Sequence, residues 1–363
     1  MNKRFIFPIL MTLVLMVSAC SVLPDKQAPE TGYTVTDALG REVSFKKVPR
    51  RIVLLGRGVF MVADAIYIFP EASEKIIAIA GMDQKSEAFL KMIDADYQEK
   101  ASLDQSASAE QIAALQPDCV VMKATNKKLG DSLEASQIPI VYLALESPSQ
   151  YQWDLFTLGE LLQNPERAKE IANFFSDSSH ALHSPIDELE PDQRPTTLLL
   201  HYSEKEGAVT YNVPPAKWIQ TTIVEMAGGQ PVWKNSPLED GWTVVSMEQV
   251  AAWNPEYIFV TAYSGSIPEI VEKFKQDSQW QALDAVKNGK IYPFASDVYS
   301  WDIPDTRWIM GAEWMAKVLH PELFPGYNPV ANAASFYQKL YGMDQPAFNK
   351  HILPILFVTL PAQ

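Results

Sequence analysis

Residues 108–118 read SAEQIAALQPD, and a closely similar stretch, SMEQVAAWNPE, occupies residues 246–256, 138 residues further along the chain. Each copy predicts a short helix, because a serine opens it as an N-cap and a proline ends it. An apolar run of the kind found in buried strands follows each copy, at residues 119–122 and 257–260. Two copies of this length and order indicate two similar halves rather than a solenoid, which needs more repeats. The sequence therefore predicts two lobes of the α/β class.

The rest of the chain divides around these two copies. We expect an N-terminal lobe over residues 33–148, a connecting helical region over 149–190 and a C-terminal lobe over 191–363, each lobe a parallel sheet flanked by helices. Within the connector, residues from Pro165 or Glu166 to about Leu189 predict one long helix that suits a rigid link between the lobes. The remaining predicted elements are a hairpin at 33–45, strands at 52–55 and 196–202, and helices at 307–319 and 331–341, while residues 343–363 receive no role.

The N-terminus has the layout of an export signal. Two basic residues precede an apolar run over residues 5–17, and small residues stand directly before Cys20. We expect residues 1–19 to be a signal peptide that is removed, Cys20 to be lipidated, and residues 20–32, which are rich in proline and polar residues, to form a tether. This predicts a protein exported and lipid-anchored to a bacterial membrane, in the periplasm or on the outer face of the cell membrane.

Composition and motifs exclude several classes of protein. A formal net charge of −14 disfavours nucleic-acid binding. Cys20 and Cys119 are the two cysteines of the chain, and Cys119 lies in an apolar run, so no disulfide framework is expected. The nucleophile-elbow pattern G-x-S-x-G and both glycine-rich phosphate-binding patterns are absent. We therefore expect a binding protein and not an enzyme.

Five features of the sequence carry a family resemblance: residues 36–43, residues 48–53, the Glu110 and Glu248 copies, residues 227–229 and residues 319–322. Together they resemble the helical-backbone class (class III) of periplasmic substrate-binding proteins, which serve ABC importers of iron-siderophores, haem and cobalamin. The resemblance implies two lobes joined by one long helix, with a ligand cleft between them. It implies a monomer that delivers its cargo to a permease dimer with its ATPase. It also implies that Glu110 and Glu248, one in each repeated copy, dock onto arginines of the two permease subunits.

Ligand-binding residues of an α/β lobe follow the carboxyl ends of its strands. This rule, applied to both lobes, selects a set of cationic, aromatic and apolar side chains. Guanidinium and ammonium groups beside aromatic rings suit an anionic, partly aromatic metal chelate, so a ferric siderophore is the favoured cargo. We expect no permanently bound cofactor and no resident metal ion. The predicted ligand-binding residues are Arg57, Met82, Lys123, Tyr202, Tyr263, Tyr299, Trp301 and Arg307.

Other assignments remain open at this stage. Arg307 could pair locally with Asp302 or Asp305, and the aromatic residues could serve interlobe packing. Haem, cobalamin, a nickel chelate or molybdate could replace the siderophore. A surface sensor or adhesin could use the same fold, and an exported enzyme with a scattered serine, histidine and aspartate is the remaining alternative. A metal inside the cargo could be contacted by His201 or by a tyrosine, whereas His180 and His183 lie in the connector and are expected to be solvated. The tyrosines considered are Tyr202, Tyr211, Tyr263 and Tyr299.

Overall fold

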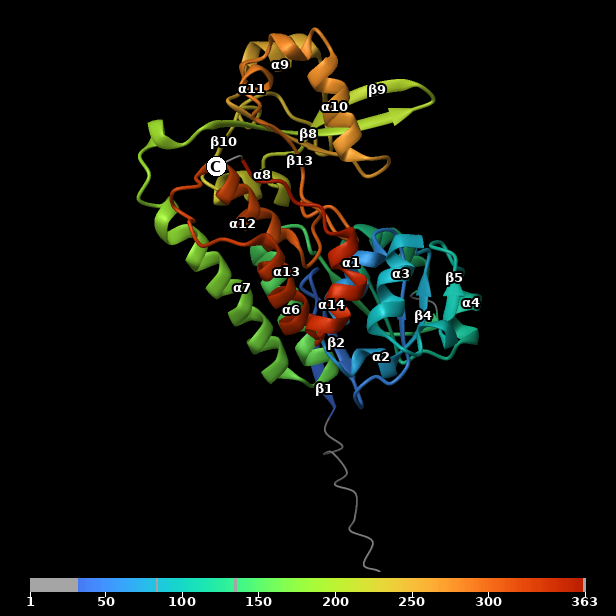
Figure 1. Ribbon diagram of the computed structural model, residues 1–363. Coiled ribbons are helices and arrows are strands. Elements are labelled where there is room, and N and C mark those ends of the chain that lie inside the picture. Colours follow the sequence, from blue (N-terminus) through green and yellow to red (C-terminus); the bar gives the residue numbers. More distant parts are fainter. Residues whose placement is uncertain (1–31, 83, 134–135, 362–363) are drawn as a thin grey trace, which may run out of the picture.

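The structure, a computed structural model, describes residues 32–82, 84–133 and 136–361. It has two α/β lobes, with the C-terminal lobe above the N-terminal lobe in Figure 1, and a long helix along one side. The predicted signal peptide, the lipidation site Cys20 and all of the tether except Gly32 lie outside the described residues. Among the described residues, none of the helices combines the length and the apolar character needed to cross a membrane.

The N-terminal lobe is built on a five-stranded parallel sheet in the order β5-β4-β3-β6-β7. Its central strands are completely buried, which explains why they read as unbroken apolar runs. The predicted hairpin at 33–45 is present as β1 and β2. The strands are β1 (Tyr33–Thr36), β2 (Glu42–Phe45), β3 (Ile52–Leu54), β4 (Ile76–Ala80), β5 (Ala101–Leu103), β6 (Cys119–Lys123) and β7 (Ile140–Leu143). The helices are α1 (Val59–Ile66), α2 (Ala72–Lys75), α3 (Gln84–Ile93), α4 (Ala109–Ala114) and α5 (Lys127–Leu133).

The C-terminal lobe has a mixed sheet. Strands β10, β8, β12 and β13 are parallel, as predicted, but β9 and β11 extend the sheet antiparallel. The strands are β8 (Thr196–Lys205), β9 (Ala208–Val213), β10 (Gln230–Pro231), β11 (Thr243–Val245), β12 (Tyr257–Thr261) and β13 (Ile291–Pro293). The helices are α8 (Ile219–Met226), α9 (Met247–Trp253), α10 (Ile267–Gln276), α11 (Asp284–Lys287) and α12 (Trp308–Leu319), and short 3-10 turns occur at 97–99, 124–126, 191–193, 280–282 and 353–355.

The two repeated stretches form equivalent units. The serine N-caps of α4 and α9 accept backbone N–H groups, from Gln111 in the first copy and Gln249 in the second. After each helix one residue adopts a left-handed conformation immediately before the proline, Gln116 with φ 48° and Asn254 with φ 38°. Each unit then feeds an interior strand of its sheet, β6 or β12. The internal repeat is therefore a structural repeat.

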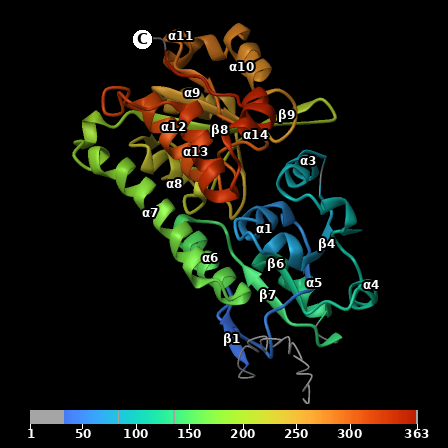
Figure 2. The same ribbon diagram turned by 60° about the horizontal axis from the view of Figure 1, so that its bottom comes forward.

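The long connecting helix is α7 (Pro165–Ile186), preceded by α6 (Pro148–Leu162). Its start is tied to the N-terminal lobe, because Asn164 donates to Glu71 and the Arg167 guanidinium donates to the Ile68 carbonyl. Its end is tied to the C-terminal lobe, where Arg194 donates to the carbonyl of Ile186. Figure 2 shows α7 running alongside both lobes. This confirms the predicted fold class, two lobes joined by one long helix.

The C-terminal part of the chain, from α13 onward, returns to the interface between the lobes. It includes residues 343–361, for which the sequence predicted no role. Helix α13 (Pro329–Tyr341) contacts α7, because Arg167 donates to the carbonyls of Lys339 and Leu340. Helix α14 (Gln345–His351) follows, and the chain then crosses the C-terminal lobe. There Phe357 and Ser296 exchange two backbone hydrogen bonds of 2.8 and 2.9 Å, and the Trp314 indole donates to the Thr359 carbonyl. We call residues 353–361 the C-terminal strap.

Candidate functional site

A cavity of about 620 Å³ lies between the lobes. Its N-terminal wall comes from the first turn of α1 and from the ends of β6 and β7. Its C-terminal wall comes from the segments that follow β12 and β13, from the start of α8 and from the residue before β11. The cavity is thus at the carboxyl edges of both sheets, where the topology predicts a ligand site. The lining residues are Phe60, Met61, Lys123, Glu146, Trp218, Gln220, Trp242, Ala262, Tyr263, Gly265, Ser266, Ile267, Pro268, Ser296, Asp297, Val298, Tyr299, Ser300, Ile303, Pro304 and Phe357.

Stacked aromatic rings form the wall on the C-terminal lobe. The imidazole of His201 packs against the rings of both Trp242 and Tyr263, at 4.6 Å from each centroid, and these two rings also contact each other at 6.2 Å. Trp218 meets Trp242 edge to face at 5.7 Å. Burial lowers the pKa of His201 to about 4, so the imidazole is neutral at physiological pH. This wall offers ring faces to a ligand at little cost in conformational entropy, since packing already fixes the rings.

A hydrogen-bonded carboxylate holds one of these rings in place. The Tyr263 hydroxyl donates to Asp302 at 2.9 Å, and the same carboxylate accepts the hydroxyls of Thr261 at 2.7 Å and of Ser300. Burial raises the pKa of Asp302, and these hydrogen bonds oppose that shift by stabilising the ionised form. Tyr263 is 46% exposed, so its ring faces the cavity while its hydroxyl is anchored.

The floor on the N-terminal lobe carries one ion pair. Lys123 ends β6, and its ammonium lies 2.5 Å from the Glu146 carboxylate and 3.2 Å from the Met61 sulfur. Glu146 follows β7, so the pair joins two neighbouring strand ends.

The structure brings three of the predicted ligand-binding residues into this cavity, namely Lys123, Tyr263 and Tyr299. Arg57 and Met82 instead line a second, more open hollow of about 510 Å³ in the N-terminal lobe. Tyr202 lines a third hollow, and its hydroxyl donates to Glu204 at 2.6 Å. Of the other tyrosines considered, Tyr211 packs against Phe274 and Trp280 and does not line the interlobe cavity.

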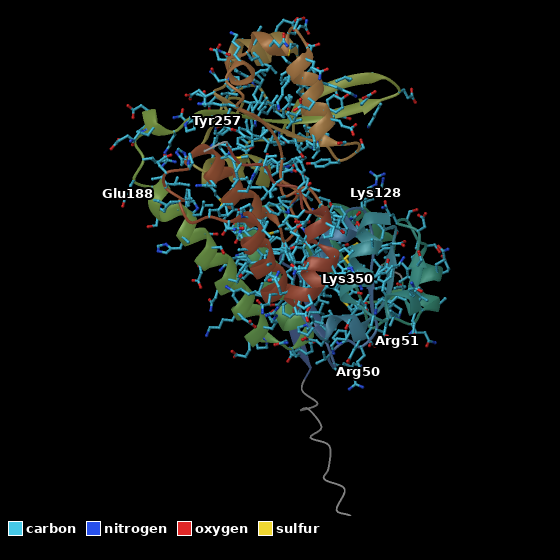
Figure 3. All side chains as sticks on the ribbon, in the orientation of Figure 1. Arg50, Arg51, Lys128, Glu188, Tyr257 and Lys350 are labelled. Atoms are coloured by element: carbon cyan, nitrogen blue, oxygen red, sulfur yellow. The ribbon has the colours of Figure 1, made fainter. Side chains whose placement is uncertain are left out.

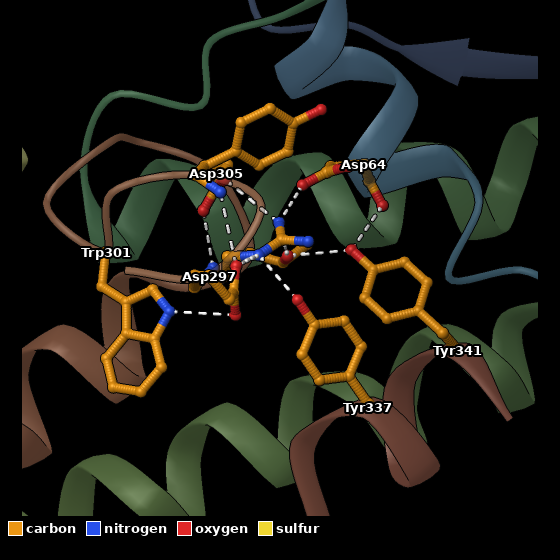
Figure 4. Close-up of polar contacts among 9 residues, drawn as sticks. Asp64, Asp297, Trp301, Asp305, Tyr337 and Tyr341 are labelled. Atoms are coloured by element: carbon orange, nitrogen blue, oxygen red, sulfur yellow. Dashed lines mark hydrogen bonds and ion pairs between the residues drawn. The ribbon is translucent and has the colours of Figure 1, made fainter. Parts of the chain in front are cut away.

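The last two predicted ligand-binding residues, Arg307 and Trp301, line none of these three hollows. Both are completely buried. The Arg307 guanidinium pairs with Asp64 of α1 in the other lobe, with Asp297 at 2.9 Å and with Asp305 at 3.1 Å (Figure 4). The Trp301 indole donates to Asp297 at 3.0 Å. The polar groups of both side chains therefore bind other residues of the protein. For Arg307, the structure contains the local ion pair with Asp305 that the sequence left open as an alternative.

This group of side chains, the Arg307 network, joins the two lobes behind the cavity. Aromatic rings cover the guanidinium, with the centroids of Phe89 and Tyr299 4.7 and 4.8 Å from its central carbon. Tyr337 and Tyr341 of α13 complete it, as Figure 4 shows. Burial raises the pKa of Asp64 to about 6, against the opposing effect of Arg307. Because Asp297 and Tyr299 also line the cavity, the network fixes part of its wall.

Glu110 and Glu248 lie on the exposed first turns of α4 and α9. Figure 1 shows these two helices far apart, each on its own lobe. In the first copy Gln111 completes the capping box, accepting the Ser108 backbone N–H at 2.9 Å. The hydroxyl of Ser108 lowers the pKa of Glu110, and backbone N–H groups do so for Glu248, so both are ionised at neutral pH. Two exposed carboxylates thus occupy equivalent positions on the two lobes.

Sequence reasoning missed several residues of the cavity. Trp242 precedes β11 rather than following a parallel strand, so the strand-end rule does not reach it. Phe357 comes from the C-terminal strap, 61 residues beyond its partner Ser296, and no local signal predicts that return. Glu146 follows β7 and could have been found by the rule. Among the described residues, none of the His, Cys, Asp and Glu side chains form a group of three placed to hold a metal ion.

The fold and the interlobe cavity define a two-lobed binding protein. The family model for periplasmic binding proteins matches residues 75–298, and the chain belongs to this family. It is a solute-binding protein of the class that serves ABC importers, and the family consists of binding proteins rather than enzymes. The family places the chain in the periplasm or otherwise outside the cytoplasm.

Three curated relatives illustrate the range of the family. The Fe(3+)-citrate-binding protein YfmC of Bacillus subtilis is 22% identical over 304 residues, 81% of this chain and 90% of YfmC. The vitamin B12-binding protein of Vibrio parahaemolyticus is 25% identical over 247 residues, 66% of this chain and 84% of that protein. The molybdate-binding protein MolA of Haemophilus influenzae is 29% identical over 102 residues, 28% of either chain.

Solved structures share the fold at lower identity. A periplasmic solute-binding protein from Veillonella parvula has a TM-score of 0.72 with 22% identity, covering 90% of this chain and 98% of its own. The nickel–histidine complex of CeuE from Helicobacter pylori has a TM-score of 0.70 with 17% identity, covering 90% of this chain and 100% of its own.

Proposed function

We propose that this protein captures an organic metal chelate between its lobes and delivers it to an ABC importer, with a ferric siderophore as the favoured cargo. The observation that carries the proposal is the interlobe cavity of about 620 Å³, walled by Trp218, Trp242, Tyr263 and Phe60. Aromatic and apolar walls suit the organic shell of a chelate, whereas a bare ion is held by clustered carboxylates, imidazoles or thiolates. The volume lies within the ordinary range for small-molecule sites, about 300–1,000 Å³.

The named cargoes of the relatives support a metal-containing solute. They are ferric citrate, vitamin B12, molybdate and a nickel–histidine complex. Of these, molybdate fits the cavity least, because a small oxyanion binds to arginine and backbone N–H donors and makes little use of aromatic walls. Cobalamin, haem and a nickel chelate are the other candidates for the same site.

We further propose that Glu110 and Glu248 dock onto the permease and that Cys20 carries a lipid anchor. Two exposed carboxylates on equivalent first turns match two related permease subunits, because arginine binds a carboxylate through paired hydrogen bonds. The anchor would hold a monomeric binding protein near the permease. Replacement of Cys20 by serine should release the protein from the membrane fraction without changing its affinity for cargo.

The cargo is tested by titrating the soluble chain from Ser21 onward and following tryptophan fluorescence. Trp218 and Trp242 line the cavity and report on a bound ligand directly. We expect saturable quenching at submicromolar concentration by one member of a panel of ferric siderophores, haem, cobalamin, nickel chelates and molybdate, confirmed by calorimetry. Silence across the whole panel would contradict the proposal and favour a sensor or adhesin.

Docking is tested separately, by uptake of the identified cargo in cells that carry the double substitution Glu110→Ala and Glu248→Ala. Uptake should be lost while the dissociation constant in solution stays unchanged, since both residues lie outside the cavity. A matched control removes two exposed carboxylates elsewhere, Glu160 and Glu188, and should retain uptake. Equal loss in both double variants would contradict the docking assignment.

A further inference from the structure

The cavity carries little net charge that a ligand could use. Among the described residues that line it, three have a formal charge, namely Lys123, Glu146 and Asp297. Asp297 is already compensated, because its completely buried carboxylate accepts hydrogen bonds from Arg307 at 2.9 Å and Trp301 at 3.0 Å. The charges that a bound ligand meets are therefore those of Lys123 and Glu146.

The two members of this pair are not equally accessible. The Lys123 side chain is 5% exposed and the Glu146 side chain 34% exposed. The ammonium is enclosed by the Glu146 carboxylate at 2.5 Å and the Met61 sulfur at 3.2 Å. A ligand in the cavity consequently approaches the carboxylate rather than the ammonium, and Glu146 neutralises the cation that lies behind it.

The first turns of α1 and α10 also line the cavity, through Phe60, Met61 and residues 265–268. Helix N-termini carry a partial positive charge, which attracts oxygen atoms with partial negative charge but is much weaker than a full cation. Glu269 in the first turn of α10 reduces the effect there. These helix ends suit amide, hydroxamate or carbonyl oxygens of a neutral ligand.

We propose that the cargo is a chelate without net negative charge, and that Glu146 determines this specificity by masking Lys123. The proposal rests on the proposed function, since it concerns the charge of the chelate bound in the same cavity. An anionic chelate would leave water for a largely aromatic and apolar cavity. Among the described residues that line it, the one ammonium is already paired. The desolvation cost of its charge would then have no compensation.

The test compares the binding of a neutral and an anionic ferric chelate. A ferric tris-hydroxamate is neutral, because three singly charged groups balance Fe³⁺, whereas a ferric tris-catecholate carries three negative charges. Calorimetry gives the ratio of the two dissociation constants for each variant. The wild-type protein should bind the neutral chelate at least tenfold more tightly. The substitution Glu146→Gln unmasks Lys123 and should shift the ratio about tenfold towards the anionic chelate, equivalent to about 1.4 kcal/mol.

The control substitution Glu188→Gln changes the net charge by the same amount. Glu188 is exposed just beyond the C-terminal end of α7, as Figure 3 shows, so this substitution should leave the ratio of the two dissociation constants unchanged. The shift in Glu146→Gln should shrink as salt is raised from 50 to 500 mM, as expected for a charge effect. Lys123→Met should shift the ratio the opposite way, since it leaves Glu146 unpaired. Thermal melting of each variant separates these effects from loss of folding.

The outcomes distinguish this proposal from the function on which it rests. Binding of neither chelate by a folded wild-type protein, together with silence across the wider panel, would refute the chelate-binding function and this inference with it. Tighter binding of the anionic chelate by the wild type, or an unchanged ratio in Glu146→Gln, would overturn the charge selectivity and leave chelate binding intact.

Discussion

The Arg307 network makes a strong prediction about stability. The substitution Arg307→Met keeps most of the volume of the side chain but removes the guanidinium that faces Asp64, Asp297 and Asp305. Breaking a buried ion pair from one side costs about 3–5 kcal/mol, because the remaining charge is buried without a partner. Three carboxylates lose their partner here, so we expect a loss at the upper end of that range, about 4–5 kcal/mol at pH 7.5.

The loss should depend on pH, which separates it from a packing defect. Burial raises the pKa of Asp64 to about 6 while Arg307 lowers it, so removing Arg307 raises that pKa further. Below this pKa the orphaned carboxyl takes up a proton and its burial becomes less costly, so the loss should be clearly smaller at pH 5.5 than at pH 7.5.

Urea unfolding of the soluble chain, followed by fluorescence at both pH values, measures the difference. The control Lys287→Met breaks an ion pair of 3.0 Å with Asp284 whose side chains are 55% and 58% exposed, and should cost less than about 1 kcal/mol. A loss below about 1 kcal/mol in Arg307→Met, or one that is identical at the two pH values, would refute the reasoning.

Three further predictions follow from the site and its surroundings. Burial raises the pKa of Asp154 to about 7 in the folded protein, whereas in the unfolded chain this carboxyl takes up a proton only near pH 4. The unfolding free energy should therefore rise as the pH falls from 8 to 6, and Asp154→Asn should flatten that rise in urea unfolding. Trp242→Ala should weaken cargo binding about tenfold or more by calorimetry, whereas the 74% exposed Trp153 can be replaced without effect. Phe357→Ala should raise the dissociation constant about threefold to tenfold, and Leu360→Ala, in the same strap, should not.

The architecture of this protein is predictable because its signals are local. The repeated helices begin at a serine, end at a proline and lead into an apolar strand, and all three signals lie within about fifteen residues. The antiparallel part of the second sheet was missed although its signal is present. Glu206 and Gly207, with φ 52° and 81°, form the two-residue hairpin turn between β8 and β9. Reading that turn would have predicted the mixed sheet.

The candidate site is harder to predict because its partners are distant in sequence. The position of Arg307 after a strand predicts a ligand-binding cation. The folded chain shows instead that its guanidinium pairs with Asp64, 243 residues away in the sequence. Lys123 lines the cavity, but its ammonium is paired with the Glu146 carboxylate. A cationic side chain that the sequence assigns to ligand binding can thus be paired with a carboxylate of the same protein. This pairing changes the net charge that we expect of the cargo.

The C-terminal strap has a consequence for the order in which the protein is made. The five-stranded sheet of the N-terminal lobe is complete within residues 52–143, so it can assemble while the remainder of the chain is still being synthesised. The cavity wall and the cover of Arg307 depend on Phe357 and Tyr337, which are synthesised long after that sheet. A chain that stops between these two regions would therefore contain a complete first sheet but an incomplete cavity wall.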